Sequence, residues 1–569
     1  MDDREILTRF KAGTLDRGQV VRLLARTVPA DEDPAPPAPV PLPPQEVRAA
    51  VTPEPAPPPP EATRPAPVAD DRVAVIGIAG RYPLAADLDA YWNNLCDGRD
   101  TATDTPIGRP GPVPLADGQR AHFLDNAAEF DPDFFGLTAR DGALMDPQER
   151  LFLETVWQAL EDAGCTGSRL DSLTGPDGRT RSVGVFAGVS AADYALLAAA
   201  AWDRGGRSMP RSGQWSLPGR PAELLGLTGP VQAVDAADAS ALAAVHLAVG
   251  ALRRGECAAA VAGGAELLLH PSRGREGAGE GVGALVLKPL AAALADGDRI
   301  HAVVRETSTG PGGAPAGALR ETRRTTACRV GEAGAALGAA ALTAAVLQLR
   351  HAALVPIGDG SGAAPWAWEG EGPRTAVVDF GAGTGPGARV VLEEPPRTEP
   401  PVAVRQAGDE RDALFLLSGP TPTHLAAAAE RLADWLAGRR EADLAAVARE
   451  LRCARAAQPC RLALRAATVD ELASLLRDFT GAPEARHADL RAGGGDPLLL
   501  AELPETADYL AALWRGRRVE QLTRLWLSGV DVDWAGLERR EPSWPGARGA
   551  GGLPGAVFLR RELWLERSG

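Results

Sequence analysis

The sequence is poor in residues that form metal sites and disulfide frameworks. It has six cysteines among 569 residues, and no two of them form a CxxC pair. They are scattered along the chain as Cys96, Cys165, Cys257, Cys328, Cys453 and Cys460. Such spacing favours neither a zinc site nor a set of disulfide bonds. We therefore expect no metal and no cofactor of the chain's own.

Long apolar runs and excess positive charge are also missing. No apolar run approaches the ~20 residues that cross a bilayer. The first stretch, MDDREILTRF, is acidic at its start and lacks the apolar core of a secretion signal. The formal net charge of −15 disfavours nucleic-acid binding, which needs a basic face. The sequence thus predicts a cytoplasmic protein with local basic patches only, at 251–256 and 318–326.

The beginning of the chain has the pattern of a small folded element on a long tether. Residues 1–28 predict two short helices, the first with Ile6, Leu7 and Phe10 at helical spacing. Residues 29–71 are rich in Pro, Ala and Glu, a composition that cannot bury a core and predicts a disordered linker. A docking element for a partner protein is one interpretation of the helices, and a frayed terminal helix is the other.

Residues 72–396, here called the main block, alternate between strand-like and helix-like patterns. RVAVIGIAGRYP (72–83) predicts a buried strand that ends at Gly and Pro. ERLFLETVWQALEDAG (149–164) predicts an amphipathic helix. Further strand-like runs occupy 182–188 and 258–269. Alternating strands and helices indicate the α/β class with much buried sheet.

Residues 397–569, here called the carboxyl-terminal block, predict a second, smaller α/β unit. The strand-like run ALFLLSG (413–419) is followed by a helix that Thr421 is placed to cap. Thr468 and Glu471 stand at capping-box spacing before another helix.

Aromatic residues gather in two stretches of this block, LWLSGVDVDWAGL (525–537) and LPGAVFLRRELWLE (553–566). No glycine-rich phosphate loop joins its strands to its helices. We expect these aromatic side chains to cover the main block and not to bind a cofactor.

Several motifs of the main block occur in a recognisable order. The most specific is FDPDFFGLTARDGALMDPQERLFLETVWQALEDAG (130–164). VAVIGIAGRYP (73–83) precedes it, and GVFAGVSAADY (184–194), GEGVGALVLKPL (279–290) and VDFGAGTGPGARVVLEEPP (378–396) follow. Together they resemble the ketosynthase (beta-ketoacyl synthase) domain of modular type I polyketide synthases, and the carboxyl-terminal block resembles the linker domain that follows it. The resemblance implies a thiolase-type fold of five α-β-α-β-α layers, usually dimeric.

The residues that carry this family's chemistry are replaced. Ketosynthases of this kind use a cysteine at a helix N-terminus and two histidines. In AVDAADASALAAVH (233–246), the cysteine position is Asp238. The second histidine position is Glu332, and the region of the first is deleted. No histidine lies between His301 and His351, where both would belong. The resemblance therefore implies a degenerate ketosynthase that lacks the cysteine and both histidines.

Two interpretations of the acidic replacements stay open. Asp238 and Glu332 each stand near the start of a predicted helix, where a carboxylate caps backbone N–H groups. Alternatively, both face one pocket, where two close carboxylates that share a proton act as acid and base. By resemblance, the candidate oxyanion loop for a thioester carbonyl consists of Phe380, Gly381, Ala382 and Gly383.

Three functions follow as hypotheses. The first is a condensation-inactive structural or partner subunit, in a homodimer or in a heterodimer with an active ketosynthase. The second is an enzyme that dehydrates, isomerises or cyclises a carrier-bound polyketide through Asp238 and Glu332. The third is a decayed remnant. The expected partners are an acyl carrier protein, with its phosphopantetheine arm, or another polyketide synthase subunit.

Overall fold

The structure is a computed structural model of the chain. Every described residue belongs to one compact unit, Val68–Gly569. The predicted helices at 1–28 and almost all of the predicted linker at 29–71 lie outside the described residues. The structure describes residues 71–106, 115, 118–190, 192–203, 208–210, 213–310, 317–357, 362–368, 372–380, 386–396, 413–481, 486–491, 505–540 and 553–565.

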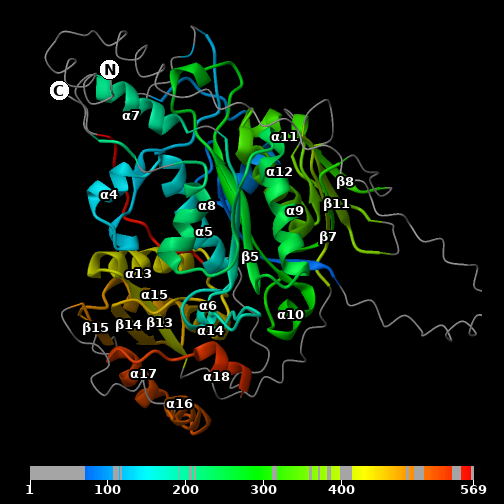
Figure 1. Ribbon diagram of the computed structural model, residues 1–569. Helices are drawn as coiled ribbons and strands as arrows, with labels where there is room; N and C mark the ends of the chain where they lie inside the picture. Colours follow the sequence, from blue (N-terminus) through cyan, green and yellow to red (C-terminus); the bar gives the residue numbers. More distant parts are fainter. Residues whose placement is uncertain are drawn as a thin grey trace, which may run out of the picture. The chain divides into compact units, whose positions relative to one another are not determined.

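A nine-stranded sheet in the order β4-β3-β5-β6-β1-β7-β12-β11-β8 forms the centre of the main block (Figure 1). Its strands are β1 (Val73–Arg81), β3 (Val183–Gly188), β4 (Val231–Val234), β5 (Ala259–Glu266), β6 (Gly281–Pro289), β7 (Ala302–Ser308), β8 (Leu319–Thr322), β11 (Thr375–Asp379) and β12 (Arg389–Glu393). β1 pairs with β6 along its whole length but with β7 only at Val73–Val75. The sheet is therefore divided at this junction into two halves.

Two helices lie between these halves (Figure 1). They are α9 (Ser240–Arg253) and α12 (Gly334–His351), and both contact strands of each half. Their many alanines allow a close approach, and Gly338 lies at a tight point of the crossing. A Cβ added there would lie 3.0 Å from Leu242 Cγ on the facing helix. The core between the halves is thus built from small side chains at close distance.

A further helical layer covers the outer face of the first half. It contains α5 (Pro147–Asp162) and α8 (Ser216–Leu225), which pack on strands including β1 and β3. The four layers are thus α5 with α8, the first half of the sheet, α9 with α12, and the second half of the sheet. The expected fifth layer, outside β7, β12, β11 and β8, is not found in the part of the chain that the structure describes. The chain is short there, with only β8 described between the end of β7 and α11 (Arg323–Val330).

Shorter elements complete the main block. The helices are α3 (Leu88–Asp97), α4 (Ala139–Leu144), α6 (Ser168–Asp171), α7 (Asp193–Asp203) and α10 (Leu290–Ala295). The single turns are η1 (Asp133–Phe135), η2 (Ala237–Ala239) and η3 (Pro271–Arg273). The short strands are β2 (Glu129–Phe130), β9 (Ala353–Leu354) and β10 (Ala364–Pro365).

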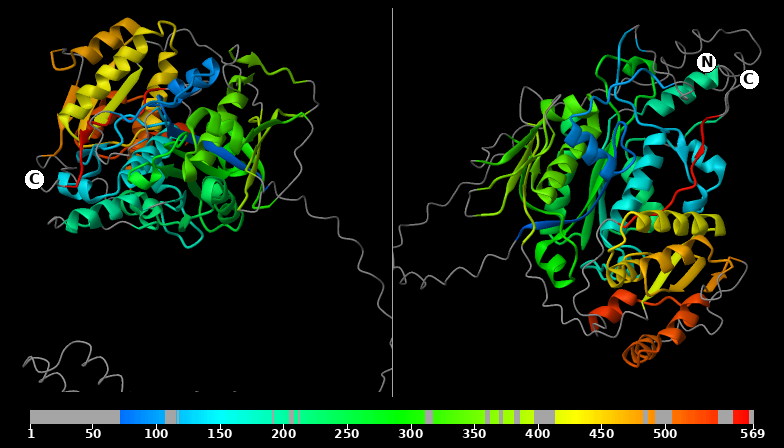
Figure 2. Two further views of the ribbon diagram at one scale, coloured as in Figure 1. Left: turned by 90° about the horizontal axis from the view of Figure 1, so that it is seen from above. Right: turned by 180° about the vertical axis from the view of Figure 1, so that it is seen from behind.

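The carboxyl-terminal block contains an antiparallel sheet with helices on both faces (Figure 2). Its strands are β13 (Leu414–Gly419), β14 (Cys460–Arg465) and β15 (Arg486–Asp489). Its helices are α13 (Pro422–Ala437), α14 (Leu444–Cys453), α15 (Val469–Arg477), α16 (Thr506–Arg515), α17 (Val519–Leu527) and α18 (Trp534–Arg540). Trp526 and Trp534 pack in this block's own core, although the stretch 525–537 also meets the main block, where the Ser168 hydroxyl donates to Asp533 at 3.4 Å.

The last described residues do cover the main block, as predicted for 553–566. β16 (Arg561–Glu562) pairs with β2. The buried Arg150 donates a 2.6 Å hydrogen bond from Nη1 to the Leu563 carbonyl. The Trp564 ring meets Tyr194 edge to face at a centroid distance of 5.1 Å. The final segment is therefore an integral part of the packed structure.

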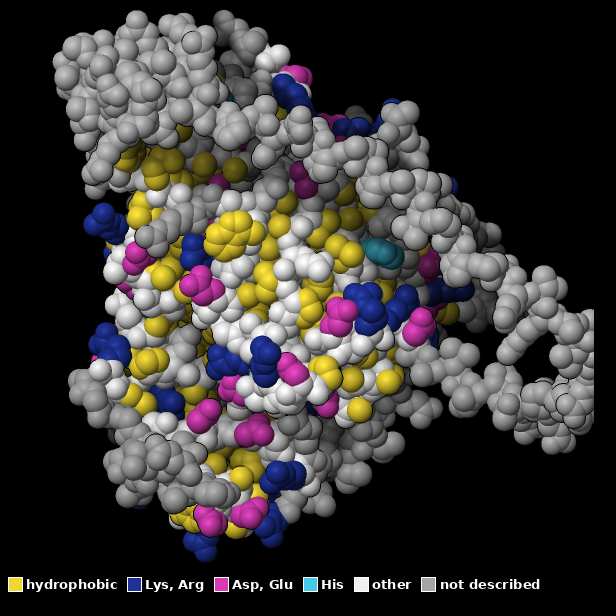
Figure 3. Space-filling model, viewed as in Figure 1, with side chains coloured by type: hydrophobic (Ala, Val, Ile, Leu, Met, Phe, Trp, Pro, Cys, Tyr) yellow, Lys and Arg dark blue, Asp and Glu magenta, His cyan; other side chains and the backbone are white. Residues whose placement is uncertain are grey.

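The surface carries charged side chains of both signs. Figure 3 shows Asp and Glu interspersed with Lys and Arg on one face, without a continuous basic stripe. Among the described residues, no helix has the length and apolar character that a bilayer crossing requires.

Candidate functional site

A tight turn leads from strand to helix around Asp238. β4 leads into η2, which leads directly into α9. Ala237 has a φ of 51°, an unusual value for a residue with a side chain, and marks a tight turn. Ser240 holds the turn together, since its Oγ donates to the Ala237 carbonyl at 2.6 Å and accepts from Ala236 N at 2.8 Å. The hydroxyl at this turn is therefore engaged within the backbone.

Gly188 of β3 packs closely against the same turn. A Cβ added at Gly188 would lie 2.7 Å from the Ala241 backbone nitrogen. Only glycine allows the strand to approach the start of α9 so closely. The turn before α9 is thus tight, and Asp238 lies within it.

Asp238 does not cap the helix that follows it. No side chain caps η2 or α9, so the capping interpretation of Asp238 is wrong. Its side chain is 29% exposed, and Oδ2 accepts a hydrogen bond from Nε of Arg323. Asp238 lies within η2, and the N-cap position of α9 is occupied by the next residue, Ala239.

Glu332 is also not a cap. α12 begins at Gly334 without a side-chain cap. The Glu332 backbone is fixed by a 2.8 Å hydrogen bond from its N–H to the Gly277 carbonyl. Its side chain is 31% exposed, and Oε2 accepts a hydrogen bond from Nη2 of Arg323. The two candidate carboxylates therefore meet at one guanidinium.

Arg323 is the first residue of α11, which the Thr322 hydroxyl caps in a capping box with Thr325. Burial lowers the pKa of the Arg323 guanidinium, but its hydrogen bonds and proximity to Asp238 and Glu332 outweigh this effect and raise the pKa. Arg323 lies in the basic stretch 318–326 of the sequence analysis. Its bridging role was not predicted, because it depends on contacts far apart in sequence.

Glu266, at the end of β5, is a further carboxylate near the start of α12, and it was not predicted as a site residue. It is 1% exposed, and Oε2 accepts a 3.2 Å hydrogen bond from Ala335 N at the start of α12. Ser190 and Arg273 also bind this carboxylate. Burial raises the pKa of Glu266. A lone glutamate inside the apolar run 258–269 was the signal available in the sequence.

A buried imidazole lies against the loop that carries Glu332. A Cβ added at Gly331 would lie 2.5 Å from Cδ2 of His122. The Thr101 hydroxyl donates to the Arg329 carbonyl at 2.7 Å, so it accepts from Nδ1 of His122 at 2.8 Å. Burial lowers the pKa of His122. This ring is thus a buried group held by Thr101, and the described contacts of Asp238 and Glu332 include no histidine or cysteine side chain.

The predicted oxyanion loop is described only at its first residue. The Phe380 N–H donates to the Ala388 carbonyl at 3.0 Å, so this donor is engaged within the backbone. Gly381, Ala382 and Gly383 lie outside the described residues. Within the described ranges, no group of three or more His, Cys, Asp and Glu side chains is arranged to hold a metal ion.

Two family models match the chain. Residues 70–278 match the beta-ketoacyl synthase N-terminal domain. Residues 416–482 match the RhiE-like KS-MAT linker domain. The first match covers the turn around Asp238, and the second covers β13 to α15.

Similar curated proteins are large polyketide synthases. Polyketide synthase ThaG of Burkholderia thailandensis is 33% identical over 651 aligned residues, which cover 92% of this chain and 11% of that protein. Polyketide synthase PksL of Bacillus subtilis is 31% identical, with 89% of this chain and 14% of that protein covered. The chain thus spans a small fraction of the length of these relatives.

Solved structures with the same fold are ketosynthases. The oxazolomycin ketosynthase domain OzmH KS7 of Streptomyces albus JA3453 is 30% identical, with a TM-score of 0.70, 87% of this chain covered and 99% of that chain covered. The ketosynthase from module 6 of the bacillaene synthase from Bacillus subtilis 168 is 24% identical, with a TM-score of 0.70 and coverages of 87% and 100%. The second likeness is one of fold.

Proposed function

Since the chain belongs to the ketosynthase (beta-ketoacyl synthase) family of modular polyketide synthases and has their thiolase-type fold, we propose that it is a condensation-inactive member. In this proposal it acts as a structural or partner subunit beside an active ketosynthase or an acyl carrier protein. It has no cofactor of its own, and the phosphopantetheine arm of a carrier protein is the group presented to it.

The contact between Asp238 and Arg323 carries this proposal. Acyl transfer to a ketosynthase requires a thiolate, and a carboxylate is far less nucleophilic toward a thioester. At this turn the carboxylate is also hydrogen-bonded to a guanidinium that it shares with Glu332. The lone pairs of the Asp238 carboxylate are therefore directed at the Arg323 guanidinium and not at an incoming acyl group.

The edge strand β4 supports a partner role. β4 pairs with β3 on one side and ends the nine-stranded sheet on the other. Val231 is 42% exposed, and Trp215 at the start of the adjoining α8 is 66% exposed. An unpaired strand edge with exposed apolar side chains is a template for pairing with another chain. A ketosynthase subunit, either a second copy or a relative, fits this edge.

Native mass spectrometry tests this role with the full chain alone and mixed with an active polyketide ketosynthase. We expect a homodimer or a heterodimer, which Val231→Lys disrupts. Leu294→Lys changes a side chain of similar exposure (45%) on α10 and should leave the assembly intact. Monomers under all conditions, or equal disruption by both variants, would contradict the partner role.

One observation favours the second hypothesis, an acid–base enzyme acting on a carrier-bound polyketide. Asp238 and Glu332 contact the same guanidinium and are partly exposed. A loss of water or a rearrangement of a carrier-bound β-hydroxyacyl chain, abolished by both Asp238→Asn and Glu332→Gln, would establish this activity. A decayed remnant would instead unfold without a cooperative transition, and the fully buried residues of β1 argue against that.

A further inference from the structure

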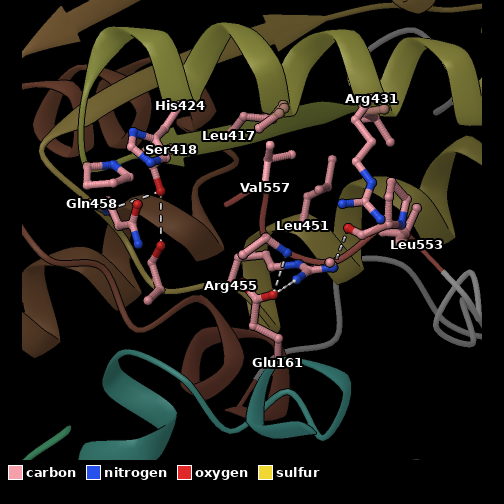
Figure 4. Close-up of a pocket in the computed structure, with 18 of the residues that line it drawn as sticks. Glu161, Leu417, Ser418, His424, Arg431, Leu451, Arg455, Gln458, Leu553 and Val557 are labelled. Atoms are coloured by element: carbon pink, nitrogen blue, oxygen red, sulfur yellow. Dashed lines mark hydrogen bonds and ion pairs between the residues drawn. The ribbon is translucent and has the colours of Figure 1, made fainter. Parts of the chain in front are cut away.

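A cavity lies between the main block and the carboxyl-terminal block, away from Asp238 (Figure 4). It contains about 680 Å³ of space between atoms, part of which is open to solvent. Its walls come from α5, from β13 and α13, from the chain after α14, and from residues 553–557. No side chain of the Asp238 site lines it.

We call this cavity between the two blocks the seam cavity. One of its ends carries excess positive charge, and we call that end the cation end. Arg455 Nη1 forms a 2.6 Å ion pair with Glu161, and its Nη2 donates to the Pro554 carbonyl at 3.0 Å. Arg431 reaches down from α13 toward the same end (Figure 4). Its guanidinium has no ion pair or hydrogen bond among the described residues. Two guanidiniums and one carboxylate leave one positive charge on a chain of net charge −15.

The middle and the opposite end differ in character. Leu417, Leu451 and Val557 form an apolar middle (Figure 4). At the far end, the Ser418 hydroxyl is engaged, since it donates to the Ala456 carbonyl at 3.0 Å. Gln458 projects its side-chain amide there without a hydrogen bond among the described residues, and we call this the amide end (Figure 4).

We propose that the seam cavity binds an elongated amphipathic anion. Its carboxylate or phosphate group lies at the cation end, its apolar chain along the apolar middle, and a hydrogen-bonding group at the amide end. A guanidinium without a partner is a preferred donor to both kinds of anion. The apolar walls exclude a fully hydrated ion and select an anion with a hydrocarbon body. This inference is independent of the proposed function, because neither Asp238 nor β4 lines the cavity.

Ligand binding in the seam cavity should also stabilise the docked segment 553–565. Residues 553–557 form one wall, and the Ala556 N–H donates to Glu161 at 2.7 Å. A ligand that contacts this wall and α13 together stabilises the docked segment by mass action. Saturating ligand should therefore raise the unfolding temperature and slow proteolytic cleavage in 553–565.

Isothermal titration calorimetry of the full chain tests the proposal with octanoate, monooctyl phosphate and octan-1-ol. We expect saturable binding of at least one anion and about tenfold weaker binding of the uncharged alcohol. Arg431→Gln should weaken anion binding about tenfold. Arg440→Gln, at an exposed arginine outside the cavity, is the matched control and should bind like the wild type. Ala428→Phe should block the cavity.

The two anions separate the possible sources of the ligand. Preference for octanoate indicates a free acyl carboxylate, and preference for monooctyl phosphate indicates a phosphate ester. Equal binding of both indicates selection by charge alone, and all three results support the site. The absence of saturable binding at millimolar concentrations, or unchanged binding in Arg431→Gln, overturns it. Arg431 is exposed, so Arg431→Gln should fold normally. This variant therefore decides the test even if Ala428→Phe fails to fold.

Discussion

Asp238 and Glu332, the two carboxylates predicted to replace catalytic residues, are joined by the guanidinium of Arg323. One carboxylate comes from the turn before α9 and the other from the loop before α12. A positive charge thus separates two negative charges that would otherwise repel one another. The bridge thus connects the turn before α9 with the loop before α12.

Removal of this guanidinium should destabilise the fold modestly. Arg323→Gln leaves Asp238 and Glu332 facing one another without a cation. All three side chains are partly exposed, so solvent screens the interaction, and we expect a loss of about 1 kcal/mol in the free energy of unfolding. Chemical denaturation at neutral pH measures the loss.

The control for this change is the neighbouring Arg324, which is also exposed. Arg324→Gln should leave stability unchanged. Adding Asp238→Asn and Glu332→Gln to Arg323→Gln should recover most of the lost stability, because no like charges then remain. A similar loss from Arg324→Gln would show that general charge, and not the bridge, is responsible.

Glu149 at the start of α5 should make stability depend on pH. It is 2% exposed, and burial raises its pKa to about 7, against an ordinary value of 4.5. As pH rises from about 4.5 to 7, the unfolded chain ionises first, so this group lowers stability over that range. Glu149→Gln should therefore be stabilising relative to the wild type by about 1–3 kcal/mol at pH 8, and by less at pH 5.

Thermal or chemical unfolding between pH 5 and pH 8 measures this difference. Glu223→Gln is the matched control, because Glu223 lies on α8 with 67% side-chain exposure and pairs with Arg220. That variant should change stability little across the range. A Glu149→Gln curve parallel to that of the wild type would show that this carboxyl does not resist ionisation in the folded state.

Arg150 should be essential for docking of the last segment. It is fully buried and donates to the carbonyl oxygens of Leu563 and Met145, both at 2.6 Å. Arg150→Met leaves these buried acceptors without a donor, which costs about 2–4 kcal/mol. We expect lower stability in denaturant and faster proteolysis within 553–565. Arg561→Met, at an exposed residue of the same segment, should change neither measurement.

Patterns of local chemistry in the sequence predicted much of the secondary structure. Thr421 and Thr468 cap α13 and α15, as their spacing indicated. The apolar run 72–83 became β1, and 149–164 became most of α5. Each of these elements is determined by residues within a few positions of one another.

Features that depend on distant contacts were not predictable in this way. Arg323 meets Asp238 across 85 positions of sequence, and nothing near either residue indicates the pairing. The capping interpretation of Asp238 failed because Asp238 lies within η2 and Ala239 occupies the N-cap position of α9. The aromatic stretch 525–537 contributes to a core of the carboxyl-terminal block, since Trp526 and Trp534 pack there.

The most direct test of the proposed inactivity is intact-protein mass spectrometry of the full chain after incubation with acyl-loaded and then malonyl-loaded acyl carrier protein. A cysteine-containing ketosynthase, treated in parallel, shows that the reagents are competent. We expect no increase in mass of this chain and no elongated product on the carrier. A covalent acyl adduct on this chain, followed by an elongated carrier-bound product, would contradict the account.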